Sequence, residues 1–343
     1  MKALGWIAGI VGLIALAVVV TLTSGALTLS LPELETRYKL PESKFVDIDG
    51  VRVHYVDEGQ GPALVLLHAS FMSLHSWNDL ASRLKGRFRV IRFDSMTNGL
   101  TGPDPKNDYS LQHNERILTA LSDKLGVREF FLLGTSSGGT VAFRYAAAHP
   151  DQVKRLILVN SAGMPRTSAT DPNRARGTRL QQWMRSYFKS KRYWRENLAS
   201  QFGGGGKPPD ELVQRVYNMN RRDTLRTEGA AMMKQFQTGD PETVLGHITA
   251  PTLVMWGKGN ITVAHLEGDV FQRWLFNAPT LLKKYEKVGH YFYLEQPEQF
   301  ASDVDAFLTG QWDDKLLRVT RSTGLAPVAP VAPVERAESA RKD

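Results

Sequence analysis

Short apolar runs recur along the chain from residue 45 to residue 285, each bounded by turn-forming or charged residues. Ala63–Leu67 is apolar at every position, which is typical of a strand buried on both faces of a sheet. The strands that this pattern predicts are Phe45–Ile48, Val51–Asp57, Ala63–Leu67, Phe88–Phe93, Arg128–Leu133, Val153–Asn160, Thr252–Trp256 and Thr280–Tyr285.

Helix-like segments alternate with the later strands. They are Trp77–Leu84, Leu111–Leu125, Gly139–Ala148, Val263–Trp274 and Pro297–Leu308. Alternation with helices predicts an α/β fold with a mostly parallel sheet between helices. Asp49-Gly50 is a hairpin signal, so we expect the first two strands to be antiparallel edge strands.

A long insertion, residues 164–245, shows no strand pattern. Its helical stretches, Arg179–Leu198 and Glu211–Phe236, are separated by a glycine run followed by Pro208-Pro209, which predicts a flexible hinge. Residues 165–235 carry fifteen Lys or Arg against six Asp or Glu, with aromatic residues between them. This basic surface is either a solvated face or one that rests on anionic lipid headgroups. No nucleic-acid motif accompanies the charge, so we expect no nucleic-acid partner.

The first thirty residues differ from the rest of the chain. Ala3–Leu31 contains no charged residue, and Ile7–Leu22 is dense in aliphatic side chains. We interpret residues 1–30 as a single-pass transmembrane anchor, with a cleaved secretory signal or a buried helix as the alternatives. Lys2 favours a catalytic body on the extracytoplasmic side of the membrane. If the segment is cleaved as a signal, we expect a secreted or periplasmic protein. Residues 31–44 then form a tether.

The C-terminal region differs from the body of the chain. After Gly310 the pattern of apolar runs is lost, and a Pro-rich repeat predicts that residues 311–343 are disordered.

The composition limits the classes of site that the chain can form. A chain of 343 residues with 42% apolar content can bury a full core, and the absence of cysteine excludes disulfides, thiolate chemistry and Cys-ligated zinc. Neither metal-binding histidine spacing nor a Gly-rich phosphate loop is present, so we expect no metal and no cofactor.

Gly134-Thr135-Ser136-Ser137-Gly138 lies between a predicted buried strand and a predicted helix. A serine in that setting, with glycines two residues before and after it, fits a nucleophile elbow, which exposes the hydroxyl above the helix N-terminus. The helix end favours developing negative charge. We therefore expect Ser136 to be a nucleophile; the alternative is a structural turn.

A serine hydroxyl needs a base to take its proton. Of the eight histidines, His290 lies in a loop after the last predicted strand and before the last predicted helix. That is where the histidine of a Ser…His arrangement in this chain order belongs. We expect His290 to be the base; the alternative is a buried histidine bonded to backbone.

Several landmarks occur in one order along the chain. They are His68 after an apolar strand, Ser73–Trp77, Gly99–Pro103, the Ser136 elbow, His149–Val153, Pro251–Gly257 and Gly289-His290. On these residues the chain from about Phe45 to Leu308 resembles the α/β-hydrolase fold superfamily, in its Ser-His esterase and carbon–carbon hydrolase branch. The resemblance implies an eight-stranded, mostly parallel sheet formed by residues 45–163 and 246–310. It also implies that residues 164–245 form a helical cap over Ser136.

The resemblance implies a triad acid three or four residues beyond Trp256-Gly257, but this chain has Asn260 there. An amide can accept a hydrogen bond from imidazole and hold its tautomer, yet it cannot stabilise imidazolium by charge. There are two alternatives: Glu267 or Asp269 is the third member of the triad, or the site has no third member.

Two further departures concern the loops around the site. His68-Ala69-Ser70-Phe71 stands where relatives have His-Gly, and the resemblance implies an oxyanion hole formed by Ser137 with Ser70 or Phe71. In the Asp94–Gly99 turn we expect Asp94 to organise the backbone. We place His68, Met96 and Asn98 at the substrate pocket.

These features predict an enzyme with a small-molecule ester as substrate. Ser136 attacks the carbonyl, His290 takes and returns the proton, and water releases the acyl-enzyme. The alternatives are carbon–carbon bond hydrolysis of a diketone, and a receptor-like hydrolase that binds an apolar ligand with little turnover.

Overall fold

The structure is a computed structural model that describes residues 2–164, 178–263 and 266–316. Most of the tail predicted to be disordered, residues 317–343, lies outside the described residues, as do residues 165–177 of the insertion. Eight strands form one sheet: β1 (Lys44–Ile48), β2 (Val51–Glu58), β3 (Ala63–Leu67), β4 (Arg89–Phe93), β5 (Phe130–Thr135), β6 (Val153–Val159), β7 (Thr252–Gly257) and β8 (Thr280–Tyr285).

The strand order is β1-β2-β4-β3-β5-β6-β7-β8. β1 and β2 form the predicted antiparallel hairpin, and β2 is antiparallel to β4. All other neighbours are parallel, so their carboxyl ends meet at one edge of the sheet. The predicted eight-stranded, mostly parallel α/β fold is therefore confirmed.

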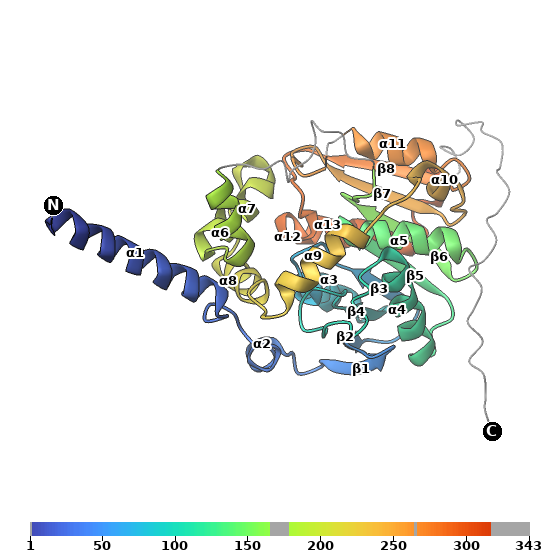
Figure 1. Cartoon of the computed structure of the whole chain (residues 1–343). Coiled ribbons are helices and arrows are strands. Elements are labelled where there is room, and N and C mark those ends of the chain that lie inside the picture. The colour runs from blue at the N-terminus through green and yellow to red at the C-terminus, as the bar shows by residue number, and fades with distance from the viewer. Residues whose placement is uncertain (1, 165–177, 264–265, 317–343) are drawn as a thin grey trace, which may run out of the picture.

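Helices lie on both faces of the sheet (Figure 1), and an apolar core packs each face against its helices. One core packs the sheet against α4 (Leu111–Lys124), α5 (Ser137–Ala148), α10 (Pro241–Gly246) and α11 (Glu267–Trp274). The other packs it against α3 (Asn78–Leu84), α12 (Phe292–Glu295) and α13 (Pro297–Leu308), with the 3₁₀ turn η1 (Leu74–Trp77) before α3. β3 and β7 are buried at every position because helices cover both of their faces.

The insertion between β6 and β7 is helical, as expected. It contains α6 (Arg179–Tyr187), α7 (Lys191–Gln201), the short turn η2 (Gly203–Gly205), α8 (Asp210–Met219) and α9 (Leu225–Gln235), which we call the cap. Each of the two predicted helical stretches is divided in two. Ser190 begins α7 by accepting the Tyr193 N–H, and a turn at 220–224 separates α8 from α9.

α1 (Lys2–Thr23) projects away from the body of the molecule (Figure 1). Within the part of the chain that the structure describes, no helix combines the length and apolarity needed to cross a membrane. The structure therefore does not support the predicted transmembrane anchor.

The segment after α1 is more ordered than a tether. α2 (Leu31–Tyr38) begins with a capping box between Ser30 and Glu33, and its Leu34 is fully buried. Leu29 forms a parallel bridge with Arg222 in the cap. The first residues packed against the body thus lie upstream of the boundary expected near Phe45.

The C-terminal boundary also differs from the prediction at residue 310. Arg155 Nη1 lies 2.7 Å from Asp313 Oδ1, and Leu316 is buried. Residues 311–316 therefore belong to the packed body, because Asp313 pairs with Arg155 near the start of β6 and Leu316 joins the apolar core that includes α13.

Candidate active site

Ser136 occupies the turn between β5 and α5, with a φ of 53° and a ψ of −122°. A non-glycine residue rarely adopts a positive φ, so this backbone is strained. The strain persists because the flanking hydrogen bonds hold the turn: Ser136 N–H donates to Val159 O at 3.2 Å, and Ser136 O accepts the Ala162 N–H at 3.0 Å. The serine thus stands at the carboxyl end of β5, beside the end of β6.

The two elbow glycines are required by close approach. A Cβ on Gly134 would lie 2.4 Å from Gly138 O, and a Cβ on Gly138 would lie 2.5 Å from Leu67 O. Strand β5, helix α5 and strand β3 can meet at this turn only if both positions lack a side chain. The glycines are a packing requirement for presenting Ser136.

His290 lies in the loop between β8 and α12 and is almost completely buried. Its Nδ1 is 3.2 Å from Oδ1 of Asn260, in the loop after β7. Asn260 Oδ1 also accepts the N–H groups of Thr262 (3.0 Å) and Val263 (3.2 Å). Two backbone donors fix the orientation of the Asn260 amide, so its oxygen faces His290 as an acceptor. The proton of His290 is therefore assigned to Nδ1, and Nε2 is the basic atom.

Burial lowers the pKa of His290 to about 4. No carboxylate among the described residues opposes this effect, since the nearest polar partner of the ring is the neutral Asn260 amide. Nδ2 of Asn260 is buried without a partner among the described residues. The arrangement holds the histidine tautomer without adding charge.

The alternative acids are placed differently. Asp269 Oδ2 pairs with Lys284 Nζ at 2.5 Å, toward the surface of the sheet edge. Glu267 is the first residue of α11, and neither residue contributes to the pKa shift of His290. The geometry favours Asn260 as the partner of His290.

Asn160, directly after β6, was not identified as a functional residue in the sequence analysis. Its Nδ2 donates to the carbonyl oxygens of Gly289 and His290, each at 3.0 Å, and its Oδ1 accepts the Gly257 N–H at 2.9 Å. Ser136 N–H is bound to the neighbouring Val159, so the ends of β5, β6 and the His290 loop are joined at one point. The feature that marks Asn160 is a positive φ of 43° at a buried residue, and this feature is visible in the structure but not in the sequence.

The loop after β3 supplies the candidate oxyanion donors. Ser70 Oγ donates to Ser137 Oγ at 2.8 Å, which places these two residues side by side next to Ser136. Ser137 is the first residue of α5, so its N–H has no partner within the helix. Phe71 N–H already donates to Asn98 Oδ1 at 2.9 Å, so the contacts favour Ser70 over Phe71 as the second donor.

The three expected pocket residues make contacts within the loops. His68 lies 2.8 Å from Ala69 O through Nδ1 and accepts the Ser95 N–H at Nε2, at 3.0 Å. Met96 is buried in the apolar core. Asn98 crosslinks the 94–99 turn to Phe71, so its amide oxygen is already occupied.

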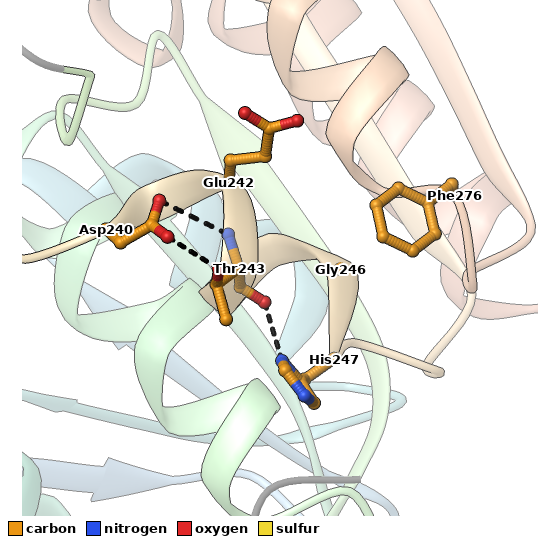
Figure 2. A pocket seen from close by; sticks show the side chains of 6 residues that line it. All are labelled: Asp240, Glu242, Thr243, Gly246, His247 and Phe276. Carbon is orange, nitrogen blue, oxygen red and sulfur yellow. Dashed lines mark hydrogen bonds between the residues drawn. The ribbon is translucent and has the colours of Figure 1, made fainter. Parts of the chain in front are cut away.

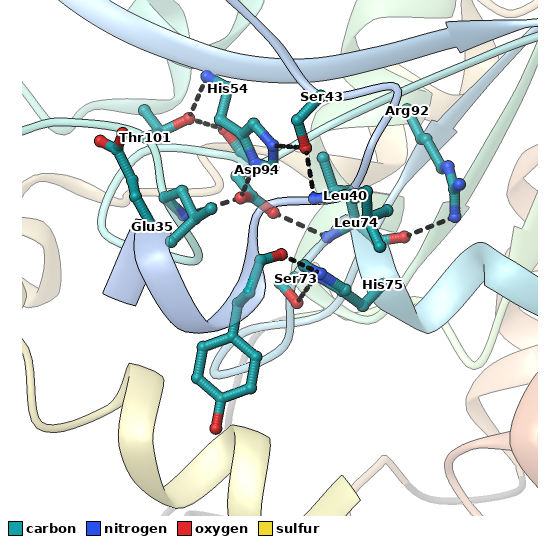
Figure 3. A network of polar contacts seen from close by, with 12 residues as sticks. Glu35, Leu40, Ser43, His54, Ser73, Leu74, His75, Arg92, Asp94 and Thr101 are labelled. Carbon is teal, nitrogen blue, oxygen red and sulfur yellow. Dashed lines mark hydrogen bonds and ion pairs between the residues drawn. The ribbon is translucent and has the colours of Figure 1, made fainter. Parts of the chain in front are cut away.

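Asp94 organises the turn, in the network of Figure 3. Its Oδ1 accepts the Leu74 N–H and its Oδ2 the Leu100 N–H, both at 2.7 Å, and Oδ2 lies 2.7 Å from His54 Nδ1. Burial would raise the pKa of the Asp94 carboxyl, but the charge and hydrogen bond of His54 oppose it, and the pKa is lowered to about 2. This carboxylate supports the loops and does not contact His290.

A cavity of about 330 Å³ lies beside α10 (Figure 2), and none of the site residues described above lines it. Its lining residues are Asp240, Glu242, Thr243, Gly246, His247 and Phe276. Among the described residues no group of three or more histidine, aspartate or glutamate side chains could hold a metal ion.

Known proteins share this architecture. Residues 62–297 match the family model for the alpha/beta hydrolase fold. A 2-hydroxy-6-oxononadienedioate/2-hydroxy-6-oxononatrienedioate hydrolase of Paraburkholderia xenovorans is 30% identical over 279 residues, which cover 78% of this chain and 95% of that enzyme. A pimeloyl-acyl-carrier-protein methyl ester esterase of Nitrosomonas europaea is 28% identical, over 74% of this chain and 98% of the relative.

Among solved structures, a membrane phospholipase A superposes with a TM-score of 0.68 at 25% identity, covering 90% of this chain and 99% of that chain. The family model spans well over half of the sequence and includes the elbow, strands β3 to β8 and the late histidine. The chain belongs to the α/β-hydrolase fold family.

Proposed function

We propose that this hydrolase cleaves carboxylic esters with apolar acyl groups through an acyl-enzyme on Ser136. The observation that supports it most directly is the strained Ser136 turn beside the Ser70–Ser137 hydroxyl pair, with a buried His290 joined through Asn160 to the end of the neighbouring strand β6. This arrangement supplies a nucleophile, a base and two N–H donors for an oxyanion.

In the proposed reaction, His290 Nε2 takes the Ser136 proton as Oγ attacks the ester carbonyl. The N–H groups of Ser70 and Ser137 stabilise the oxyanion, and His290 returns the proton to the leaving alkoxide. Water, deprotonated by His290, then releases the acid. Asn260 holds the ring but adds no charge, so we expect slower turnover than that of an enzyme with an aspartate there.

Carbon–carbon bond hydrolysis is the second candidate. The Paraburkholderia relative, named as a 2-hydroxy-6-oxononadienedioate/2-hydroxy-6-oxononatrienedioate hydrolase, aligns over 95% of its length at 30% identity. A receptor-like hydrolase that turns its ligand over slowly is the third, and the neutral Asn260 at the position of the acid supports it.

One experiment separates the three candidates. A fluorophosphonate probe should label Ser136, and the purified protein should then be assayed with p-nitrophenyl esters of rising chain length and with a vinylogous 1,5-diketone. Ester turnover supports the first proposal, and turnover of the diketone alone supports the second. Labelling without turnover of either substrate supports the third.

We further propose that α1 attaches the enzyme to a lipid surface, with the catalytic body on the extracytoplasmic side and the basic cap near the headgroups. Among the side chains of α1 that the structure describes, ten large apolar ones are exposed, including Trp6 at 73% and Leu13 at 68%. A membrane phospholipase A is the structural relative that covers 90% of this chain. Flotation of the full chain, but not of a chain lacking residues 1–23, with phosphatidylglycerol-containing vesicles tests this proposal. Failure of the full chain to float would contradict it.

A further inference from the structure

Glu295, five residues after His290, is a partly buried carboxylate that no step of the proposed reaction uses. Its Oε1 accepts the N–H groups of Gly289 and Tyr291, both at 3.1 Å. Its Oε2 accepts the N–H of Gly289 at 2.9 Å and that of Gly203 at 2.7 Å. One side chain thus joins both sides of the His290 loop to η2 in the cap.

The backbones of the cap and the loop are in direct contact at the same place. A Cβ on Gly203 would lie 2.4 Å from Gly289 N, and a Cβ on Gly289 would lie 2.2 Å from Gln201 O. His290 N–H itself donates to Gln201 O at 2.7 Å. Glycine at both positions is what allows a helix end of the cap to reach the backbone of the base.

The chemistry of the contacts requires a carboxylate. Two oxygens without a hydrogen accept from three N–H groups on two segments, whereas a glutamine would offer one acceptor and turn a donor toward the others. Burial raises the pKa of Glu295, and the N–H groups of Gly289, Gly203 and Tyr291 oppose that rise. Burial is the larger effect, so the pKa stays above its ordinary value, while the three donors favour the ionised form.

We propose that Glu295 is a positioning residue whose carboxylate clamps the cap to the His290 loop, so that the position of the cap sets the position of the base. The clamp itself follows from the contacts above; its effect on the reaction rests on the proposed function. A movement of α7 or η2 on ligand binding would be transmitted to His290 through the backbone of one loop.

The first test measures the clamp without any reaction. Amide hydrogen exchange is compared between the wild type, Glu295→Gln, Glu295→Ala and the control Glu298→Gln, whose side chain is 85% exposed. We expect Glu295→Ala to lose protection at Gly203, Gly289 and Tyr291 together, and Glu295→Gln to lose it on one side of the clamp only. Unchanged exchange at all three amides in Glu295→Ala would overturn the proposal.

The second test measures the position of the base through the rate of fluorophosphonate labelling of Ser136 as a function of pH. We expect Glu295→Ala to label at least about tenfold more slowly at pH 7, and the acid limb of the profile to move up from near 4 toward the ordinary value of 6.5. The reason is that a released His290 is rehydrated. A merely structural role would lower the melting temperature without moving that limb, and this outcome would also overturn the proposal.

Among the residues that the structure describes, the two phenols and the amide that face this pair do not titrate in that range. The Tyr291 and Tyr293 phenols have a pKa raised by burial, and Asn260 is neutral. Gly203→Ala, which presses the cap away from the loop but keeps the carboxylate, should shift the profile in the same direction. Gly229→Ala in α9, where an added Cβ meets no atom within 4 Å, is the matched control.

The two tests distinguish a failure of the proposed function from a failure of the Glu295 clamp. If wild-type Ser136 is not labelled at all, the proposed function is wrong, but amide exchange still decides whether Glu295 clamps the loop. If Ser136 is labelled and the Glu295 variants behave like the wild type in both measurements, only the clamp is wrong.

Discussion

Asn260 Oδ1 lies 3.2 Å from His290 Nδ1, and the same oxygen is held in place by the N–H groups of Thr262 and Val263. The other amide atom, Nδ2, is buried and makes no hydrogen bond to a described residue. An aspartate at this position would keep all three contacts of Oδ1 and would replace an unpaired donor by an oxygen. The site therefore has room for a charge that the chain does not supply.

We expect Asn260→Asp to keep or raise kcat on a simple ester, because a carboxylate stabilises the imidazolium formed in the transition state. The new charge should also raise the pKa of His290 by about 1–3 units. Burying the carboxylate opposes part of this gain. Asn260→Ala should lower kcat, since the tautomer is released. Steady-state kinetics measures both effects. An unchanged kcat in both Asn260 variants, together with a large loss of kcat in Glu267→Gln or Asp269→Asn, would contradict the assignment of Asn260.

The pH dependence of the wild type follows from the buried base. Because burial lowers the pKa of His290 to about 4, the base stays unprotonated well below the ordinary histidine value of 6.5. The acid limb of kcat/KM should therefore lie near pH 4–5. The stability that comes from keeping this ring neutral is present above about pH 6.5 and is lost as the pH falls toward 4. An acid limb at 6.5 or above, in a protein that is still folded, would show that a charge partner is present.

Ser136→Ala and His290→Ala should each abolish ester hydrolysis. Because the two side chains act as a unit, the double variant should be scarcely less active than either single variant. The measurement is kcat/KM on the best p-nitrophenyl ester, with circular dichroism to show that each variant is folded. Substantial ester hydrolysis by Ser136→Ala would contradict the proposed mechanism.

Deletion of residues 1–23 should leave a folded, active enzyme, whereas deletion of residues 1–30 should destabilise it. The longer deletion removes Leu29, which bridges to Arg222, and Ser30, which caps α2. Loss of an N-cap alone costs about 0.5–2 kcal/mol. Thermal unfolding of the two truncations checks this; equal melting temperatures would show that the 24–30 segment contributes nothing.

Asn160→Asp should be strongly destabilising although it preserves shape. The Asn160 amide donates to two carbonyl oxygens, of Gly289 and His290, and a carboxylate would place an oxygen against both. Each buried group left unsatisfied costs about 1–3 kcal/mol. Chemical denaturation should show a loss of this order, while Asn107→Asp on an exposed turn serves as the control. If Asn160→Asp leaves the free energy of unfolding unchanged, the His290 loop is held by other contacts.

The strands and the elbow could be predicted because their signals are local. β3 coincides with the predicted Ala63–Leu67, a continuous apolar run, and β8 coincides with the predicted Thr280–Tyr285, a short strand-like run. Ser136 could be identified because a strand, two glycines and a helix follow one another within a few residues. The eight-stranded, mostly parallel sheet came from the family resemblance and is confirmed, whereas the order of its strands is seen only in the structure.

The cap and the termini were predicted less well. The two long helical stretches of the insertion divide at Ser190 and near residue 220, where capping and turn contacts compete with helical spacing. The tether proved to contain α2, whose Leu34 packs against the body, and residues 311–316 proved to pack against β6 and α13. Amphipathic spacing does not reveal which short segments find an apolar surface to cover.

The sequence by itself determined the α/β fold, the nucleophile candidate Ser136, the base candidate His290 and the substitution of an amide at residue 260, because each depends on residue types at short spacing. Only the tertiary structure decided which residues meet. Whether Ser70 or Phe71 offers its N–H depends on Asn98, 27 residues away from Phe71, and the clamp by Glu295 joins residues 92 positions apart. Such contacts depend on where the folded sheet places the ends of its strands, and no local pattern of residues records that placement.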